Sequence, residues 1–414
     1  MDPKADHLES AKLSEMTGAT TAGEVITFYS YKGGTGRSMA LANIACLLAR
    51  QAGARGVLAV DWDLEAPGLH RFFRTHVAPS LDSNEHSSQT FLERPGLIDL
   101  LERLKKLAAT VPELSEEVPQ ASYQTLRDSI SIDDYVVDTD IESLHFMKAG
   151  RFDRDYASRI NTFGWEQFFE RAPWALPWLL QWLTEKYRYV LIDSRTGVTD
   201  TSGICSALLP EKLVVVFTPN RQSLEGAVDS VRRAINYRGS SDDLRPLRVF
   251  PLPSRVEPAR PALQTHWRFN SEVGYQPAFE SLFTELYGLA ECNLGPYFDD
   301  VQIQHVPDYA YGEEIAVLLE TVHRLSLARS YETFASRLTA PANPWEAETK
   351  EYDPRRSAMA LAVVLQAICL EFHVSRFTRE LRMPDEEGQR SFGKGTLLKH
   401  EQFQRIKSDA EWVA

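Results

Sequence analysis

The feature that most constrains the fold of this chain is a strand, a glycine-rich turn and a helix in direct succession. Residues 25–30 read VITFYS, and β-branched and aromatic residues of this kind are typical of a strand. The glycines follow in residues 32–36, and residues 38–52 have the apolar spacing of a helix. Because a second strand pattern, GVLAVD, follows at residues 56–61, the segment is a βαβ unit and predicts a parallel sheet.

The turn itself, YKGGTGRS at residues 31–38, has the composition of a phosphate-binding loop. Glycines allow the backbone to turn with positive φ angles and bring its N–H groups close to phosphate oxygens. The helix that starts at Ser38 adds the positive end of its dipole, and the Ser38 hydroxyl is suited to ligate Mg²⁺. We therefore expect a contiguous group of residues to contact phosphate, namely Gly33, Gly34, Thr35, Gly36, Arg37, Ser38 and Met39.

Three further apolar runs indicate strands, at residues 189–193, 213–218 and 247–252. They show no alternation of apolar and polar residues, which favours strands that are buried on both faces of a sheet. Carboxylates stand at the ends of two strand patterns, with Asp63 just after the second strand and Asp193 closing the run YVLID. The carboxyl ends of parallel strands are where open α/β sheets bind ligands, so these aspartates are candidate site residues.

The three motifs KGGTGRS, DWD and DSRTG resemble those of the ParA/MinD-type ATPases, whose phosphate loop is called a deviant Walker A motif. Within that family the chain resembles a subgroup with KGGxGR in place of KGGxGK. The resemblance spans residues 24–335 and implies an α/β fold, a three-layer P-loop NTPase with a mainly parallel central sheet. It also implies ATP and Mg²⁺ as cofactors, and a homodimer with ATP sandwiched at the interface.

The resemblance assigns a role to individual residues. Lys32 matches the signature lysine that reaches the nucleotide of the partner subunit, and Asp63 matches the carboxylate that positions the attacking water. Together with Arg37 they are the candidate catalytic residues. Asp193 matches the Walker B aspartate and is expected to hold Mg²⁺ with Ser38.

Departures from the family pattern bear on turnover and base choice. Arg37 replaces the usual lysine, and because arginine is bulkier and planar, hydrolysis is expected to be slow, absent or dependent on another cation. Arg195 is either that cation, bound at the nucleotide, or a member of a structural ion pair. Ser254 and Arg255 stand where the family often has Asn-Arg against the base, so Arg255 is a candidate nucleotide contact.

The chain is expected to divide into three parts. Residues 1–22 are polar and predict a flexible N-terminal tail, and residues 23–340 form the ATPase domain with helical insertions. Prolines mark a linker at the start of residues 341–414, which are otherwise expected to be a helical C-terminal appendage. Late in the ATPase domain we expect a strand at residues 301–306 and a helical segment at residues 311–338.

Charge and cysteine content limit the partners. Forty-five basic and 58 acidic residues give a net charge of −13, which argues against a whole-protein grip on polyanions. DNA binding is therefore not favoured, although isolated arginine pairs leave it open, and membrane attachment is not expected. The four cysteines lie far apart without a C-x-x-C motif, which indicates reduced thiols, no thiolate metal site and a cytoplasmic location.

Two functions remain open at this level. The first is a dimeric switch ATPase of ParA/MinD type that binds ATP, hydrolyses it slowly and regulates an unidentified protein partner. The second is a nucleotide-dependent recruitment or sensor module that does not hydrolyse ATP, for which the resemblance suggests a bacterial defence or conflict operon. The intact Asp63 favours the first, because a site used only for binding has no need of a water-positioning carboxylate.

Overall fold

A seven-stranded sheet forms the centre of the protein in the computed structural model, which describes residues 22–77, 91–110, 127–197, 200–240, 246–321 and 326–346. The strand order is β3-β4-β2-β5-β1-β6-β7, and every neighbouring pair is parallel except β3 and β4. The strands are β1 (Glu24–Tyr29), β2 (Val57–Asp61), β3 (Val137–Asp138), β4 (Leu144–Met147), β5 (Tyr189–Asp193), β6 (Lys212–Phe217) and β7 (Arg248–Pro253). The predicted α/β class with a mainly parallel sheet is confirmed.

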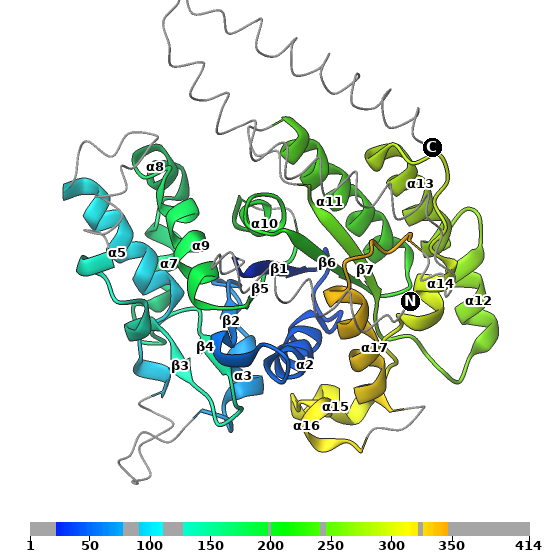
Figure 1. Cartoon of the computed structure of the whole chain (residues 1–414), viewed down its shortest axis with the longest axis horizontal. Helices are drawn as coiled ribbons and strands as arrows, with labels where there is room; N and C mark the ends of the chain where they lie inside the picture. Colours follow the sequence, from blue (N-terminus) through cyan, green and yellow to red (C-terminus); the bar gives the residue numbers. More distant parts are fainter. Residues whose placement is uncertain are drawn as a thin grey trace, which may run out of the picture. The chain divides into compact units, whose positions relative to one another are not determined.

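Helices cover both faces of this sheet and make the three layers visible in Figure 1. One layer contains α2 (Arg37–Ala49) and α17 (Leu327–Thr339), and the other contains α9 (Ala175–Lys186). The other helices of the described residues are the 3₁₀ helices η1 (Gly53–Arg55) and η2 (Ile132–Tyr135), α3 (Leu69–Phe73), α5 (Leu97–Thr110), α7 (Tyr156–Thr162), α8 (Trp165–Arg171), α10 (Asp200–Gly203), the π-helix η3 (Ile204–Leu208), α11 (Arg221–Ser240), α12 (Pro261–Phe269), α13 (Tyr275–Tyr287), α14 (Gly295–Asp300), α15 (Pro307–Gly312) and α16 (Ala316–Leu319).

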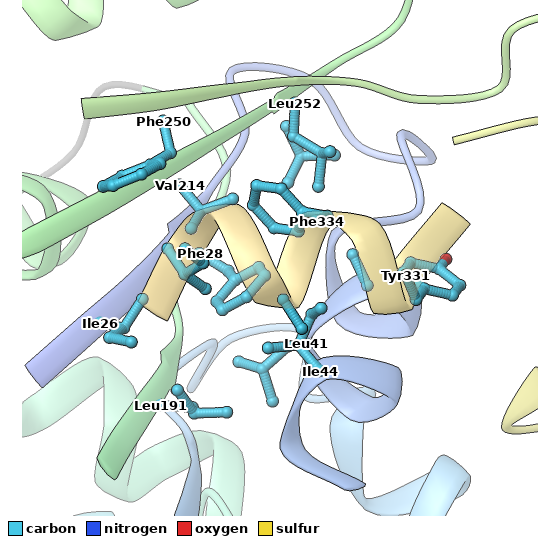
Figure 2. Packing of buried hydrophobic residues seen from close by; sticks show 14 of the residues in the cluster. Ile26, Phe28, Leu41, Ile44, Leu191, Val214, Phe250, Leu252, Tyr331 and Phe334 are labelled. Carbon is cyan, nitrogen blue, oxygen red and sulfur yellow. The ribbon is translucent and has the colours of Figure 1, made fainter. Parts of the chain in front are cut away.

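Alternate side chains along β2 and β5 enter two different cores, one on each face of the sheet. Phe28 and Leu191 point toward α2 and α17, as Figure 2 shows. Val190 and Ile192 belong instead to the core under α9. Both sets are fully buried, which explains why the strands are continuously apolar in sequence rather than alternating.

Helix α2 is buried along almost its whole length because it lies between the sheet and α17. Its small residues let the neighbouring backbones approach closely, and Leu41 and Ile44 fill the space between β1 and Phe334 of α17 (Figure 2). This packing fixes the helix whose first turn carries the end of the phosphate loop.

Three tryptophans in and just before α9 pack against one another. Trp174 and Trp178 are 4% and 0% exposed, and the rings of Trp178 and Trp182 are 5.0 Å apart. All three lie in or against the core on the α9 side of the sheet.

Two expectations from the sequence, for residues 301–306 and 311–338, are wrong. The segment 301–306 lies beside β7 but forms only an isolated bridge between Val256 and Gln304, because Pro251 and Pro253 supply no N–H groups to a ladder. The expected helical segment at 311–338 is interrupted, since α15 ends at Gly312, the next residue, Glu313, is in the left-handed conformation, and α17 begins only after its Ser326 cap.

Several expectations lie outside the described residues. They include nearly all of the N-terminal tail and the helical C-terminal appendage, and the described part of the chain ends at Glu346. Within that part, no helix combines the length and the apolar composition needed to cross a membrane.

Candidate functional site

The phosphate loop lies between β1 and α2, where the sequence predicted it. Gly34 and Gly36 have φ angles of 74° and 87°, which residues with a Cβ rarely adopt. A Cβ on Gly36 would lie 3.2 Å from the hydroxyl of Ser254, so this glycine also permits close contact with the loop after β7. The backbone of the loop therefore depends on glycine for both its turn and its packing.

The strand order brings three strand ends together. β5 lies between β2 and β1, and Asp193 on β5 pairs in register with Asp61 on β2 and with Phe28 on β1. The loops that follow these strands therefore start side by side at one edge of the sheet. This arrangement is the crevice in which doubly wound α/β proteins bind ligands.

Arg37 is the centre of a buried ion-pair cluster at this edge. Its Nε donates to Oδ1 of Asp193 at 2.5 Å, and its Nη2 donates to Oδ2 of Asp63 at 3.0 Å. The Ser38 hydroxyl donates to the second carboxylate oxygen of Asp193 at 2.6 Å. Four of the five residues predicted to carry catalysis or magnesium binding, from three separate motifs, are therefore in direct contact, and Lys32 lies outside this cluster.

Burial and charge act against each other within this cluster. Burial lowers the pKa of Arg37, but the charges of Asp193 and Asp63 outweigh it and raise the pKa above its usual value. Burial raises the pKa of Asp193, and Arg37 and the Ser38 hydroxyl oppose that effect. The guanidinium is consequently held as a cation between two buried carboxylates that it partly neutralises.

Asp61 is a site residue to which the sequence analysis gave no role. It is fully buried, its Oδ2 accepts a hydrogen bond from the backbone of Leu69 at 3.2 Å, and the imidazole of His70 lies 3.9 Å away. Burial raises its pKa to about 6, and His70 acts in the opposite direction. Asp61 therefore closes the loop that carries Asp63. In the sequence, this role could have been recognised from the position of Asp61 at the end of an apolar strand.

The outer residues of the site occupy its entrance. Arg195 makes an ion pair with Glu65. Of the two roles considered for Arg195, this contact is the structural ion pair. Lys32 is half-buried beside its neighbour Tyr31, with 5.9 Å between its Nζ and the ring centroid. Arg255 follows β7 with an exposed side chain and a φ of 55°, on the loop that contacts Gly36.

Tyr31 occupies the position of the first glycine in the usual phosphate loop, and the structure shows how its side chain is accommodated. The ring lies against Gly226 on α11, where an added Cβ would come within 2.0 Å of the tyrosine Cδ1. Residue 226 is therefore a glycine because the ring fills the space that a side chain would take. No local sequence signal joins these two positions, which are far apart in the chain.

Two buried polar atoms of the loop have no hydrogen-bond partner among the described residues. They are the hydroxyl of Thr35 and Nη1 of Arg37. Thr35 is 2% exposed and Arg37 is 7% exposed, so leaving these donors unsatisfied is costly. Phosphate oxygens are acceptors of the required kind, and the loop therefore fits a nucleotide phosphate.

Magnesium also fits this donor set when phosphate is counted among the ligands. Mg²⁺ is usually held in proteins by one or two carboxylates or hydroxyls together with phosphate oxygens and water. Ser38 and Asp193 are 2.6 Å apart and supply those two oxygens. Within the described ranges no group of three or more His, Cys, Asp or Glu side chains is arranged to hold a metal by itself.

Comparison with known proteins finds similar chains among solved structures alone. No family model matches the sequence, and no curated protein matches it. Among solved structures, the chain is similar to a variant of McdA from Cyanothece in complex with ATP, with 14% identity, 77% of this chain and 97% of that chain covered, and a TM-score of 0.48. It is similar to the cell division ATPase MinD of Pyrococcus furiosus (16% identity, 76% and 99% covered, TM-score 0.42). It is also similar to a ParA family ATPase from Chlorobium tepidum (16%, 77% and 100%, 0.43).

Proposed function

We propose that this protein binds ATP with Mg²⁺ and acts as a slowly hydrolysing, dimeric switch ATPase of ParA/MinD type that regulates a partner protein. The observation that carries the proposal is the convergence of Arg37, Ser38, Asp63 and Asp193 at one edge of a parallel sheet, next to a glycine loop. The unsatisfied donors of that loop match the oxygens of a phosphate chain.

Each residue has a separate task in this proposal. The loop backbone from Gly33 to Gly36 and the start of α2 hold phosphate, while Ser38 and Asp193 hold Mg²⁺. Magnesium supplies charge neutralisation at the phosphates when it is bound. Asp63 orients the attacking water, and Arg37 turns from the carboxylates toward the phosphates.

A homodimer is part of the proposal because Lys32 lies at the rim of its own site. Its backbone carbonyl accepts a hydrogen bond from the Ser30 hydroxyl at 3.0 Å, which orders the loop, while among the described residues its side chain contacts only the neighbouring Tyr31. A position of this kind suits a lysine that reaches across to a second subunit. The partner protein, a cytoplasmic location and base contacts by Arg255 are further parts of this proposal.

The test is phosphate release by the full chain with MgATP. We expect Asp63→Asn to lower the turnover about 100-fold, the scale of a lost proton-transfer or water-positioning group, while ATP binding persists. Asp140→Asn is the matched control, because Asp140 is exposed and, among the described residues, its carboxylate pairs with His76 at 3.0 Å. Turnover in Asp63→Asn equal to that of the wild type would show that Asp63 has no catalytic role.

The second candidate, a nucleotide sensor without hydrolysis, is favoured by one observation. Arg37 holds Asp63 in a hydrogen bond at 3.0 Å, so the water-positioning carboxylate is engaged by the residue that replaces the usual lysine. Arg37→Lys separates the two functions, because lysine is a point charge that cannot bridge both carboxylates. A sensor gives background phosphate release in the wild type and measurable release in Arg37→Lys, with ATP-dependent dimerisation in both.

A further inference from the structure

A large cavity of about 930 Å³ lies beside the candidate nucleotide site and is separate from it. It is a half-open pocket lined by residues of α8, of α10 and η3, and of α11, and residues of the phosphate loop and the carboxylate cluster do not line it. Its size is within the range of small-molecule sites. Its wall contains the π-helix Ile204–Leu208, an element that occurs frequently at functional sites.

The cavity combines an aromatic wall with a hydroxyl-lined floor. Trp165 and Phe169 of α8 stack on each other, with centroids 6.1 Å apart and an interplanar angle of 26°. The floor contains the hydroxyls of Tyr29 and Ser230, which are 2.8 Å apart, and Ser206 lies nearby on η3. An aromatic wall with a few convergent polar groups is the usual composition of a site for a planar ligand.

One cation stands at the cavity and has no carboxylate partner in the described part of the chain. Arg233 lines the cavity, and its Nε donates to the carbonyl of Asp229 at 3.3 Å, whereas the preceding Arg232 forms an ion pair with Glu285. Burial raises the pKa of Tyr29 on the floor, and the charge of Arg233 opposes that effect. Glu166 also lines the cavity, on the exposed side of α8.

The floor of the cavity is connected to both motifs of the nucleotide site. Tyr29 is the last residue of β1, directly before the phosphate loop, and its hydroxyl donates to the carbonyl of Gly197 at 3.0 Å. Gly197 closes the DSRTG motif that begins at Asp193, and Ser202 donates to the same carbonyl at 2.8 Å. Tyr29 thus connects the phosphate loop with the DSRTG motif, and a ligand that contacts Tyr29 contacts both motifs through this one residue.

We propose that this cavity is a second ligand site, for a planar aromatic molecule that carries an anionic group, and that its occupancy changes the nucleotide affinity of the neighbouring site. The aromatic body lies against Trp165 and Phe169, and the anion lies at Arg233. The coupling is carried by the hydrogen bonds of Tyr29 to Gly197 and Ser230. Binding at this site does not require the proposed hydrolysis.

The first test uses the fluorescent probe 8-anilinonaphthalene-1-sulfonate, an aromatic anion with a planar naphthalene ring, with the full chain. Gly203 lines the cavity in helical conformation, and a Cβ built on it meets nothing within 4 Å. Gly203→Phe is therefore expected to fill the cavity without unfolding the chain and to weaken probe binding at least about tenfold. The matched control is Gly239→Phe, because Gly239 is also helical, exposed and free of nearby atoms but does not line the cavity.

The second test separates charge from shape. N-phenyl-1-naphthylamine has the same aromatic body without the sulfonate. We expect Arg233→Ala to weaken the anionic probe up to about fivefold and to leave the neutral probe unchanged, with Arg232→Ala as the control. Equal effects of Arg233→Ala on both probes would show that the site does not select an anion.

The third test measures coupling by calorimetric titration of Mg²⁺ and a non-hydrolysable ATP analogue with and without the anionic probe. Both ligands are expected to bind together and to change each other's affinity by the same factor, about fivefold or more. Three outcomes would overturn the proposal. They are simple displacement of the probe by the nucleotide, probe binding that Gly203→Phe leaves intact, and equal nucleotide affinity with and without the probe. Loss of nucleotide binding alone, with probe binding unchanged, would instead count against the proposed ATPase function.

Discussion

Arg37 gives the sharpest prediction, because it is the only cation in contact with two buried carboxylates in the described structure. Arg37→Met keeps an unbranched side chain in the same space but leaves Asp193 and Asp63 without their counter-charge. Asp193 is 0% exposed and Asp63 is 6% exposed, so water replaces the lost partner poorly. Removing one member of a buried ion pair costs about 3–5 kcal/mol, and we expect the free energy of unfolding to fall by that amount at neutral pH.

The loss is expected to depend on pH with a defined sign. Without Arg37, burial raises the pKa of Asp193 further above the value of 3.8 that applies in the unfolded chain. A carboxyl whose pKa is raised by folding binds more protons in the folded state, so stability is lost as the pH rises through the raised value. The destabilisation by Arg37→Met is therefore smaller at about pH 5 than at about pH 8.

The assay is urea unfolding of the full chain without nucleotide, followed by circular dichroism at both pH values. Arg195→Met is the matched control, because its ion pair with Glu65 is partly exposed and is expected to contribute less than about 1 kcal/mol. Added Mg²⁺ is expected to stabilise Arg37→Met more than the wild type, since a divalent cation supplies the missing charge. A loss of less than about 1 kcal/mol at neutral pH, or a loss that grows toward acid, would refute the reasoning.

Three other perturbations test the packing and the electrostatics. Gly226→Ala brings a methyl group within 2.0 Å of the Tyr31 ring and is expected to lower the melting temperature and to cost about 1–3 kcal/mol, whereas the loss vanishes in the Tyr31→Ala background. Trp178→Ala empties a fully buried site in α9, and we expect a loss of about 3–5 kcal/mol in chemical unfolding. Burial lowers the pKa of Lys148 to about 8, so the unfolding free energy is expected to rise with pH above that value toward 10.5, and Lys148→Met is expected to remove this rise. A rise that persists in Lys148→Met would assign it to other groups.

The sequence was sufficient to predict the parts of the protein in which local pattern and tertiary structure agree. The apolar run at β5 and the glycine loop after β1 lie where their composition indicated. Asp63 and Asp193 came together because parallel strands place their carboxyl ends at one edge, a rule that requires no knowledge of distant contacts.

The sequence could not predict features that depend on pairs of distant residues. Nothing local indicates that Arg37 turns to two carboxylates, because that choice depends on the register of β2 against β5. The expected strand at 301–306 is wrong for a similar reason. Its own composition suits a strand, but the prolines of the neighbouring β7 deny it a ladder.

The contact between Tyr31 and Gly226 has a consequence for how this chain can change over evolution. The ring at position 31 and the glycine at position 226 on α11 are linked, since a side chain at position 226 is accepted only after the ring at position 31 has been lost. Among relatives of this chain, an aromatic residue at position 31 is expected to occur with glycine at position 226. Relatives with glycine at position 31 are free to carry a side chain at position 226, and an alignment of such relatives would reveal the pair as covarying columns.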